Sequence, residues 1–579
     1  MIKMEYQKNR SLVDVLLKYS NKKAIVQDAD CISYIELASV IDTIGKNIRT
    51  MGFGSVAIHI LDKMHIMIVA LSCMNIGIPF IVLDYNNPRA FNEKILREAE
   101  ITEVIYEGEI NLDSTKSIQL DKLMNPSDSV FEMAIDNNER ILFYIATSGS
   151  AGNPKVAERY LSAFKRDFIE MKDKFPYLFN QVAQQYAKLN FSYGLENSLL
   201  LLLGGTTICF NQKIMGVNDV EEMFVEINNN KATVVFWSTP IIKLFSKHYK
   251  LCEQIPDCVK CIYTGGEPLV VSADLVLIFK YKGILLINDY GCSELGKLFS
   301  NPFYKELKDL DAYNVVGVGK PLKGYEALVL DENNNEVEEG YLYLKSELKF
   351  PCSYVNKSII TNEKRINNYW IYNTQDIAKK IEDEIIVLGR EMNSVNVSGY
   401  RVELEQVEYL INNTLGEIEV CVVLPHLNQY LETTLFCFYV GSIEKTSVRE
   451  KLMEIAPQYM IPAAFFKVDE VFLLPNGKVD RKRNENAFKK EMQEKSFDET
   501  KLAQRIYKYL VKILGIEFGN LKEIYKVPFS DYGFDSLMFV DFISTIEEKE
   551  RVKINADIAA QKLRCLKDIV EWVNDRVSD

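Results

Sequence analysis

One stretch of this 579-residue chain carries the most information about its fold: Ile145-Ala-Thr-Ser-Gly-Ser-Ala-Gly-Asn-Pro-Lys155. A loop rich in Gly, Ser and Thr can direct several backbone N–H groups and hydroxyls at one anion, and Lys155 adds a positive charge at its end. The stretch follows an apolar run at 141–145, which predicts a strand, and we expect a helix after the loop. It lacks the Gly-Lys-Ser/Thr of the Walker pattern, and a polar surface loop is the alternative. The preceding strand favours a phosphate-binding loop.

Short apolar runs alternate with helical patterns over the first two thirds of the chain. Residues 55–61 and 79–83 predict buried strands on either side of an apolar helix at 65–76. This order is typical of a mostly parallel sheet and predicts an α/β fold. Three more strands of this kind are predicted at 233–236, 261–263 and 284–287. Because a parallel sheet builds its ligand sites where such strands end, we expect the functional site there.

The composition is that of a soluble globular protein, with 47% apolar and 26% charged residues. The net charge of −13 argues against nucleic acid or an anionic membrane as a partner. No segment reaches the ~20 apolar residues of a membrane span, and residues 1–10 lack an apolar signal region, so we expect a cytoplasmic protein. The eleven cysteines are scattered, and Cys258 and Cys261 have no second pair for a zinc site. We expect reduced thiols.

The length predicts roughly three or four domains at about 100–200 residues each. We place a core at 1–388 and a compact α+β subdomain at 389–490, with strands at 418–424 and 434–439 and a helix at 403–412. A charged, linker-like run at 481–500 follows, and we set the linker itself at 491–500. Residues 501–579 show helical spacing at 502–514, 537–546 and 566–573, which predicts a small helical bundle.

The loop at 145–155 resembles the phosphate loop of the acyl-adenylate-forming (ANL) superfamily, which includes acyl-CoA ligases and the adenylation domains of nonribosomal peptide synthetases. Further stretches match motifs of this superfamily in the same chain order, across almost all of residues 10–485. They are 79–88 for the early core motif, Thr264-Gly-Gly-Glu267 for the adenine-side loop, Asn288-Asp-Tyr-Gly-Cys-Ser-Glu294, Tyr372-Asn-Thr-Gln-Asp376 for the ribose motif, Gly389-Arg390 through Gly399-Tyr-Arg-Val-Glu-Leu404 for the hinge, Tyr459-Met-Ile-Pro462, and Pro475-Asn-Gly-Lys-Val-Asp-Arg481.

The last domain resembles a peptidyl or acyl carrier protein. Its mark is Tyr532-Gly-Phe-Asp-Ser-Leu537, and the resemblance makes Ser536 the attachment site of 4′-phosphopantetheine. As structure alone, Asp-Ser before an apolar helix is an ordinary helix N-cap, and both interpretations can hold together. The resemblance therefore implies a multi-sheet α/β adenylate-forming core, a small mobile α+β subdomain and an all-α four-helix carrier bundle.

The resemblance also implies roles for individual residues. The residues implied to hold the β- and γ-phosphates of ATP are Thr147, Ser148, Gly149, Ser150, Gly152 and Lys155. Those implied at the rest of the nucleotide are Ser293 at the α-phosphate, Glu294 at Mg²⁺, Asn288 and Tyr290 at adenine with Gly266, Glu267 and Gly291 beside them, and Asp376 and Arg390 at the ribose. Lys478, which in isolation is a turn residue, is implied to bridge the carboxylate and the α-phosphate in the transition state. Lys155, Glu294 and Lys478 are the implied catalytic groups.

The chain departs from the superfamily pattern at several positions. Met392 occupies the place of the pivot, where the superfamily has Asp or Lys, but a pivot need only absorb a change in φ and ψ. Val156 replaces the Gly after the loop lysine, Gln375 replaces a Gly of the ribose motif, and Gly340-Tyr-Leu342 is a weakened Gly-Glu-Leu. None of these changes removes a charged catalytic group.

The acid pocket also departs from the pattern. Ser192 stands where amino-acid-activating domains have the Asp that anchors an α-ammonium, and a hydroxyl cannot replace that charge. The other implied pocket residues are Tyr193, Glu196, Phe236, Tyr263, Gly265, Asp289, Lys297 and Leu298. Either Glu196 or Asp289 binds an amine from a new direction, or Asp289 pairs with Lys297 in a pocket for an uncharged aryl or hydroxy acid. Glu196 and Lys297 facing solvent is a third alternative.

The leading hypothesis is an adenylation–carrier enzyme that loads a small carboxylic acid onto its own phosphopantetheine, in nonribosomal peptide or related secondary-metabolite biosynthesis. It implies ATP and Mg²⁺, a phosphopantetheinyl transferase, and a separate downstream condensation or tailoring enzyme, because condensation and thioesterase motifs are absent from the sequence. One alternative is an acyl- or aryl-CoA ligase that uses free CoA or a separate carrier. Another is a degenerate nucleotide-binding scaffold without chemistry, which the retained charged groups argue against.

Overall fold

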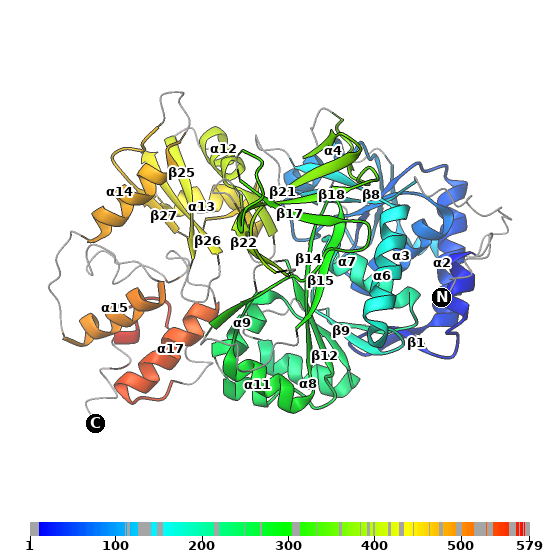
Figure 1. Ribbon diagram of the computed structural model, residues 1–579, viewed down its shortest axis with the longest axis horizontal. Coiled ribbons are helices and arrows are strands. Elements are labelled where there is room, and N and C mark those ends of the chain that lie inside the picture. Colours follow the sequence, from blue (N-terminus) through cyan, green and yellow to red (C-terminus); the bar gives the residue numbers. More distant parts are fainter. Residues whose placement is uncertain are drawn as a thin grey trace. The chain divides into compact units, whose positions relative to one another are not determined.

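The structure is a computed structural model, and its helices and strands are shown in Figure 1. It describes residues 11–109, 112, 116–125, 140–147, 154–212, 219–247, 249–266, 269–303, 313–331, 333–357, 362–382, 384–390, 394–397, 400–414, 418–427, 433–443, 445–462, 464–473, 479–493, 501–514, 529, 536–554, 563–566, 568–570 and 573. The chain divides into two compact units, Met1–Gly149 with Asn153–Glu391 and Ser150–Gly152 with Met392–Asp579. The division falls at the predicted pivot.

The first unit contains an eight-stranded sheet with the order β15-β14-β12-β11-β9-β10-β1-β2. Its strands are β1 (Lys23–Gln27), β2 (Asp30–Ser33), β9 (Val182–Gln185), β10 (Thr207–Phe210), β11 (Val234–Phe236), β12 (Cys261–Gly265), β14 (Leu285–Cys292) and β15 (Gly296–Phe303). The inner pairs are parallel, whereas the outer pairs β1–β2 and β14–β15 are antiparallel. The strands predicted at 233–236, 261–263 and 284–287 are confirmed as β11, β12 and β14.

A seven-stranded sheet of the same unit has the order β19-β8-β7-β4-β3-β5-β6. Its strands are β3 (Val56–His59), β4 (Phe80–Val82), β5 (Glu103–Tyr106), β6 (Lys116–Gln119), β7 (Ile141–Thr147), β8 (Lys155–Tyr160) and β19 (Ser353–Tyr354). The predicted strand–helix–strand unit is confirmed, because β3 and β4 are parallel and the helix α3 (Lys63–Ile76) connects them. These two sheets make the predicted α/β core.

Two smaller sheets complete the first unit. A five-stranded sheet contains β17 (Glu326–Leu330), β18 (Glu339–Ser346), β20 (Glu363–Ile366), β21 (Tyr369–Ile381) and β22 (Glu384–Arg390), and a two-stranded sheet contains β13 (Leu269–Ser272) and β16 (Tyr313–Val316). The remaining helices of the unit are α1 (Leu12–Leu17), α2 (Tyr34–Thr50), α4 (Arg89–Glu98), α5 (Leu120–Leu123), α6 (Leu161–Lys174), α7 (Ser192–Leu203), α8 (Val220–Asn230), α9 (Thr239–Lys247), α10 (Tyr249–Glu253) and α11 (Ala273–Lys282).

Helices α3 and α7 are buried on almost every side. The leucine run at 199–203 lies in α7, and all five leucines belong to the main apolar core cluster. A helix that is apolar all round is typical of the interior of a large domain. Among the described residues, no helix is long and apolar enough to cross a membrane.

The prediction of a helix directly after the phosphate loop is wrong. Residues 155–160 form strand β8, which pairs antiparallel with β7, and helix α6 begins only at Leu161. Val156 and Ala157 are buried in this sheet. The hairpin pairing supplies the backbone hydrogen bonds of this segment, so it folds as a strand.

The second unit contains a two-stranded sheet, a three-stranded sheet and helices. Its elements are β23 (Ser394–Val397), β24 (Tyr400–Glu403), α12 (Leu404–Thr414), β25 (Ile418–Leu427), β26 (Thr433–Gly441), α13 (Lys445–Met453), β27 (Ala464–Lys467), α14 (Arg481–Gln493), α15 (Lys501–Leu514) and α17 (Ser536–Glu550). The predicted helix at 403–412 and strands at 418–424 and 434–439 are confirmed. Of the carrier bundle, α15 and α17 pack in one apolar cluster with Leu566, Ile569, Val570 and Val573.

The linker-like interpretation of residues 481–500 is wrong for its first part, which is helix α14. Arg481 forms a buried ion pair with Glu408 of α12. Phe488 stacks on Phe438 with ring centroids 4.2 Å apart. Asn484 of the same helix is also buried and exchanges two hydrogen bonds with the Phe472 backbone. These buried contacts dock an otherwise charged run, since an amphipathic helix is stabilised mainly by packing one face.

Candidate active site

Strands β7 and β8 hold the two ends of the predicted phosphate loop. Thr147 lies opposite Lys155 in the antiparallel register, and its hydroxyl donates to the Lys155 carbonyl oxygen over 3.4 Å. Thr147 and Lys155 therefore lie together at one end of the hairpin. The loop residues predicted to bind phosphate between them, Ser148, Gly149, Ser150 and Gly152, lie outside the described residues.

Parallel strands β12 and β14 bring the predicted adenine-side residues together where they end. Gly265 lies opposite Asp289, and a Cβ at Gly265 would come within 2.3 Å of the Asp289 carbonyl oxygen, so only glycine fits. Asn288 donates through Nδ2 to the carbonyl oxygens of Val316 and Gly317, at 3.2 and 3.3 Å. Its Oδ1 is then the atom that can accept a hydrogen bond from an amino group such as that of adenine.

The predicted adenine and ribose residues meet through Tyr290. The Tyr290 hydroxyl donates to the carboxylate of Asp376, which is buried in β21. Arg390 of β22 lies opposite Asp376 in the antiparallel register. Gln375, at the position where the superfamily has Gly, has a φ of 64°. The backbone here needs the left-handed conformation that glycine adopts at least cost.

Glu294, the predicted magnesium ligand, is buried beside Tyr354, whose hydroxyl donates to Glu294 Oε1 over 2.8 Å. Among the described residues, no group of three or more His, Cys, Asp or Glu side chains is arranged to hold a metal ion. A single carboxylate fits Mg²⁺, which keeps several waters and is often bound through one or two carboxylates and the phosphates of its nucleotide.

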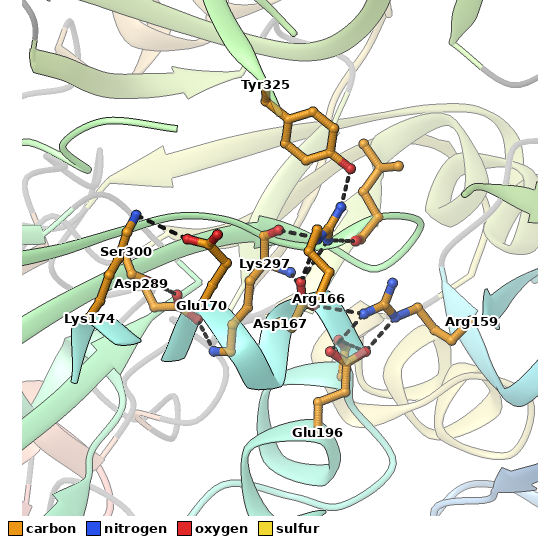
Figure 2. A network of polar contacts seen from close by, with 12 residues as sticks. Arg159, Arg166, Asp167, Glu170, Lys174, Glu196, Asp289, Lys297, Ser300 and Tyr325 are labelled. Carbon is orange, nitrogen blue, oxygen red and sulfur yellow. Dashed lines mark hydrogen bonds and ion pairs between the residues drawn. The ribbon is translucent and has the colours of Figure 1, made fainter. Parts of the chain in front are cut away.

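Arg159 of β8 is the centre of a buried network of charges, shown in Figure 2. Its side chain is 0% exposed. Nε and Nη2 donate to the two carboxylate oxygens of Glu196, at 2.6 and 3.0 Å, and Nη2 also donates to Asp167 Oδ2 at 3.1 Å. Burial opposes the charge of Arg159, but the carboxylates of Glu196 and Asp167 outweigh burial and raise its pKa. Two-pronged pairing of this kind is among the strongest polar contacts in proteins.

Arg166 and Asp167 of α6 hold the segment that follows the predicted phosphate and magnesium residues. Arg166 Nη2 donates to Asp167 Oδ1 at 2.7 Å and to the carbonyl oxygens of Leu295 and Lys297 at 3.2 and 3.3 Å. Asp167 Oδ2 accepts from the Lys297 backbone N–H at 3.3 Å. Arg166 also donates to the hydroxyl of Tyr325. The segment 295–297 is thus tied to α6 immediately after Glu294.

Lys297 and Asp289 form a second buried ion pair in the predicted acid pocket. Lys297 Nζ donates to Asp289 Oδ2 and to the Tyr263 hydroxyl, each at 2.8 Å. The Ser300 hydroxyl donates to Asp289 Oδ1. Burial raises the pKa of Tyr263 well above its ordinary value, and the negative charge of Asp289 adds to the shift. The hydroxyl therefore stays protonated.

Three aromatic side chains of the predicted pocket contact each other. The ring centroids of Tyr193, Phe236 and Tyr263 lie 5.0 to 6.3 Å apart. The Tyr193 hydroxyl donates to the Tyr263 carbonyl oxygen over 2.9 Å. Leu298, by contrast, lies in the apolar cluster that includes Leu344 and Tyr372 of the five-stranded sheet. The three aromatic side chains therefore lie together as predicted for the pocket, whereas Leu298 packs in a different apolar cluster.

The contacts favour one of the alternatives for the acid pocket. The carboxylate of Glu196 accepts from Arg159 and, at 2.8 Å, from the Ser192 hydroxyl. Asp289 is occupied by Lys297 and Ser300. Both carboxylates therefore already have partners, as in the alternative with an Asp289–Lys297 pair. Burial of Glu196 and Lys297 contradicts the alternative in which they face solvent.

Besides the loop residues and Arg390, which is described only through its backbone pairing in β22, three predicted residues have no described side chain. Glu267 and Lys478 lie outside the described residues, and Ser536 is described only as the first residue of α17. The predicted attachment site therefore lies at a helix N-terminus. The N-cap interpretation of Asp535-Ser536 also predicts that the helix begins there.

Six residues of the site were not predicted from the sequence: Arg159, Arg166, Asp167, Ser300, Tyr325 and Tyr354. Arg159 lies in a strand whose neighbours Glu158 and Tyr160 are also polar, which hides its burial. The available signal was the polar run Glu158-Arg159-Tyr160, which is unusual in a strand inside a sheet. Because a helix was predicted at this place, the run was not recognised as unusual.

The family follows from a comparison with known proteins. The family model of AMP-binding enzymes matches residues 14–354. This chain belongs to the AMP-binding enzyme family. A second model, the phosphopantetheine attachment site, matches residues 504–573.

Similar proteins include a peptide synthetase, a solved protein with adenylation and PCP domains, and a CoA synthetase. Gramicidin S synthase 2 of Brevibacillus brevis is 26% identical over 441 residues, covering 72% of this chain and 10% of that protein. The chain thus spans about a tenth of the length of that relative. An NRPS protein containing adenylation and PCP domains, solved in its holo form with a vinylsulfonamide inhibitor, has a TM-score of 0.74 at 17% identity, covering 98% of this chain and 96% of its own. The o-succinylbenzoate CoA synthetase of Bacillus subtilis has a TM-score of 0.70 at 15% identity, covering 83% of this chain and 99% of its own.

Proposed function

We propose that this chain uses ATP to activate a small carboxylic acid as an acyl-adenylate and transfers the acyl group to the phosphopantetheine of its own carrier domain. The observation that carries the proposal is the presence of both family models in one chain, in the order adenylation then carrier. The solved two-domain NRPS protein aligns with almost the whole chain, which supports the same domain order.

The first half of the reaction brings a carboxylate to the α-phosphate of ATP, so it needs cations and N–H donors at the phosphates. We assign this task to Lys155 and Ser293. Lys155 begins β8 in the β7–β8 hairpin, and Ser293 precedes the segment 295–297 that Arg166 holds. Lys478 would add its charge between the two reacting groups. Mg²⁺, when bound at Glu294, would neutralise part of the phosphate charge.

The adenosine moiety would be held by residues of three strands. Asn288 and Tyr290 of β14 would bind adenine, with Gly266, Glu267 and Gly291 beside it, and Asp376 and Arg390 would bind the ribose. The contact between Tyr290 and Asp376 supports this assignment, because it joins the adenine and ribose residues into one surface.

The second half would use the thiol that phosphopantetheine supplies when attached at Ser536. Ser536 is the first residue of α17, so it lies next to the unpaired backbone N–H groups of a helix N-terminus. Such N–H groups favour a phosphate ester. A phosphopantetheinyl transferase would make the attachment, and a separate condensation or tailoring enzyme would receive the loaded acid, in nonribosomal peptide or related secondary-metabolite biosynthesis.

The test combines a transferase with a panel of carboxylic acids. Co-expression with a phosphopantetheinyl transferase should add one phosphopantetheine, seen by intact mass, and Ser536→Ala should prevent the addition. With ATP and the preferred acid, the mass of the carrier should rise by the acyl group. A Ser536→Ala protein that is still modified would overturn the assignment of the site.

The likeness to a CoA synthetase supports one second candidate, a ligase that uses free CoA. The same panel separates the two. A Ser536→Ala protein should still form adenylate but no acylated carrier. If that variant makes acyl-CoA from free CoA as fast as the unmodified chain loads itself, the free-CoA ligase is the better assignment.

A further inference from the structure

The buried network around Arg159 and Lys297 is electrically balanced. Its three cations and three carboxylates are Arg159, Arg166, Lys297, Asp167, Glu196 and Asp289. Each carboxylate has a cation within 3.1 Å, and the formal charges cancel. The aromatic residues Tyr193, Phe236 and Tyr263 adjoin it through the Lys297–Tyr263 contact.

A balanced network cannot stabilise another buried charge. A substrate ammonium would find Glu196 and Asp289 already paired, and Ser192 offers only a hydroxyl. A second carboxylate on the substrate would leave one negative charge in excess. Either charge would be desolvated without compensation, which is strongly unfavourable.

Within the described ranges, two hydrogen-bond donors of the network remain unused, one on Arg159 and one on Lys297. Arg159 Nη1 is buried and has no hydrogen-bond partner among the described residues. In Figure 2, this nitrogen is the one of the three in Arg159 without a dashed line. The Lys297 ammonium has three N–H bonds, and in the described part of the chain its Nζ meets two acceptors, Asp289 and Tyr263. An unmade hydrogen bond at a buried donor is costly, so a ligand that supplies an acceptor is favoured.

We infer that the acid activated at this site carries, besides its reacting carboxylate, a neutral oxygen acceptor, a hydroxyl or keto group, which Lys297 recognises while Arg159 keeps Glu196 and Asp167 neutralised. The inference rests on the proposed function and names its substrate class. Lys297 is the specificity-determining residue, and Arg159 is a positioning residue. The aromatic side chains beside Lys297 contact the carbon skeleton.

The first experiment compares acids that share one skeleton and differ at one position. One set is a short aliphatic acid carrying 2-hydroxy, 2-oxo, 2-amino, carboxylate or no substituent, and the other is benzoate with the corresponding hydroxy, amino, carboxylate or hydrogen. ATP–pyrophosphate exchange and the mass of the holo carrier are measured on the full chain. The hydroxy or keto member should exceed its amino, dicarboxylate and unsubstituted counterparts by on the order of 10²-fold in kcat/KM, because a site with buried donors rejects analogues that leave them unpaired. The two sets distinguish an aliphatic from an aryl acid.

The second experiment removes the ion pair as a unit. Lys297→Met with Asp289→Asn leaves no unpaired buried charge, so it tests recognition rather than folding. The preference for the oxygen-bearing acid over the unsubstituted acid should fall toward one, while the KM for ATP stays unchanged. The matched control is Lys345→Met with Glu326→Gln, an ion pair of the five-stranded sheet at 2.8 Å, which should keep the full preference.

The outcomes separate this inference from the proposed function. Preference for an amino acid or a dicarboxylate over its hydroxy and keto counterparts overturns the inference and leaves the proposed function standing. A double variant that keeps the full preference also overturns it. If the chain accepts phosphopantetheine but activates no acid of either set, the proposed function fails, and the inference fails with it.

Discussion

Among the single residues, a buried guanidinium determines what the neighbouring carboxylates can do. Glu196 looks in the sequence like a candidate for binding an amine. In the structure, both of its oxygens accept from Arg159, and one also accepts from Ser192. A carboxylate in the interior that already holds a cation has little affinity left for a second one.

We expect Arg159→Met to destabilise the first unit by about 3–5 kcal/mol, because it leaves Glu196 buried without its cation. Arg159→Met combined with Glu196→Gln should recover part of this loss. Urea unfolding of the full chain measures the difference. The control is Arg89→Met, because the Arg89 side chain is 41% exposed and its i,i+4 pair with Glu93 should contribute about 0–1 kcal/mol. Equal stability of Arg159→Met and Arg89→Met would contradict the buried pair.

Lys478 carries a prediction that comes from the sequence. We expect Lys478→Ala to lower kcat for adenylate formation by about 10²–10³ with a smaller effect on substrate affinity, by analogy with the loss of one oxyanion donor. Pyrophosphate release at saturating substrates measures kcat. Lys467→Ala, at an exposed lysine that ends β27, is the control and should leave the rate unchanged. Near-normal kcat in a folded Lys478→Ala protein would remove Lys478 from the mechanism.

Among the secondary-structure elements, the hairpin β14–β15 connects the predicted magnesium ligand to the buried charges. Gly296 has a φ of 75°, and a Cβ there would come within 2.1 Å of Arg159 Nη2 and 2.8 Å of Asp167 Oδ2. The start of β15 therefore depends on glycine for two independent reasons, its backbone conformation and its lack of a side chain.

Gly296→Ala should therefore cost more than backbone strain alone. Gly283→Ala is the matched control, because Gly283 has a φ of 65° and no atom within 4 Å of an added Cβ. We expect about 1–2 kcal/mol for Gly283→Ala, the ordinary cost of a left-handed residue with a side chain. Gly296→Ala should lose more stability and should also lose adenylate formation, measured by pyrophosphate exchange. Equal effects of the two changes on both readouts would mean that the Arg159–Asp167 pair moves aside freely.

In the molecule as a whole, the division at Glu391 and Met392 coincides with the pivot that the motif order predicts. A proposed function with two half-reactions needs the second unit to present Lys478 for the first and the carrier for the second. A few residues that absorb a change in φ and ψ are enough for such a change.

We expect Met392→Pro to leave adenylate formation largely intact and to slow loading of the carrier, because proline fixes φ near −65° at the pivot. Pyrophosphate exchange reports the first half-reaction, and the time course of carrier mass reports the second. Met392→Ala, which removes the side chain but keeps the backbone freedom, should load at the normal rate. Parallel loss of both half-reactions in Met392→Pro would show that the change acts on folding instead of on the pivot.

The amino-acid sequence alone was enough to predict the family, the order of the domains and six strands of the core, β3, β4, β7, β11, β12 and β14. Periodicity identified β3, α3 and β4 because a parallel strand buried on both faces is continuously apolar, and this signal is local. The motif order also assigned Tyr290 and Asp376 to neighbouring parts of one nucleotide, and the structure places their side chains in contact. The phosphate role of the loop at 147–155 stays a prediction.

By contrast, only the three-dimensional fold decided which buried charges pair with one another. It also decided that residues 155–160 form a strand and that residues 481–493 form a helix. The pairing of Arg159 with Glu196 and of Lys297 with Asp289 depends on which strand ends and helix faces meet, and no spacing along the chain encodes that. Residues 155–160 became a strand through pairing with β7, and Arg481 and Phe488 turned a linker-like run into α14 through contacts with α12 and β26. The physical reason is the same in each case: long-range pairing and burial supply more free energy than the local propensity of the segment.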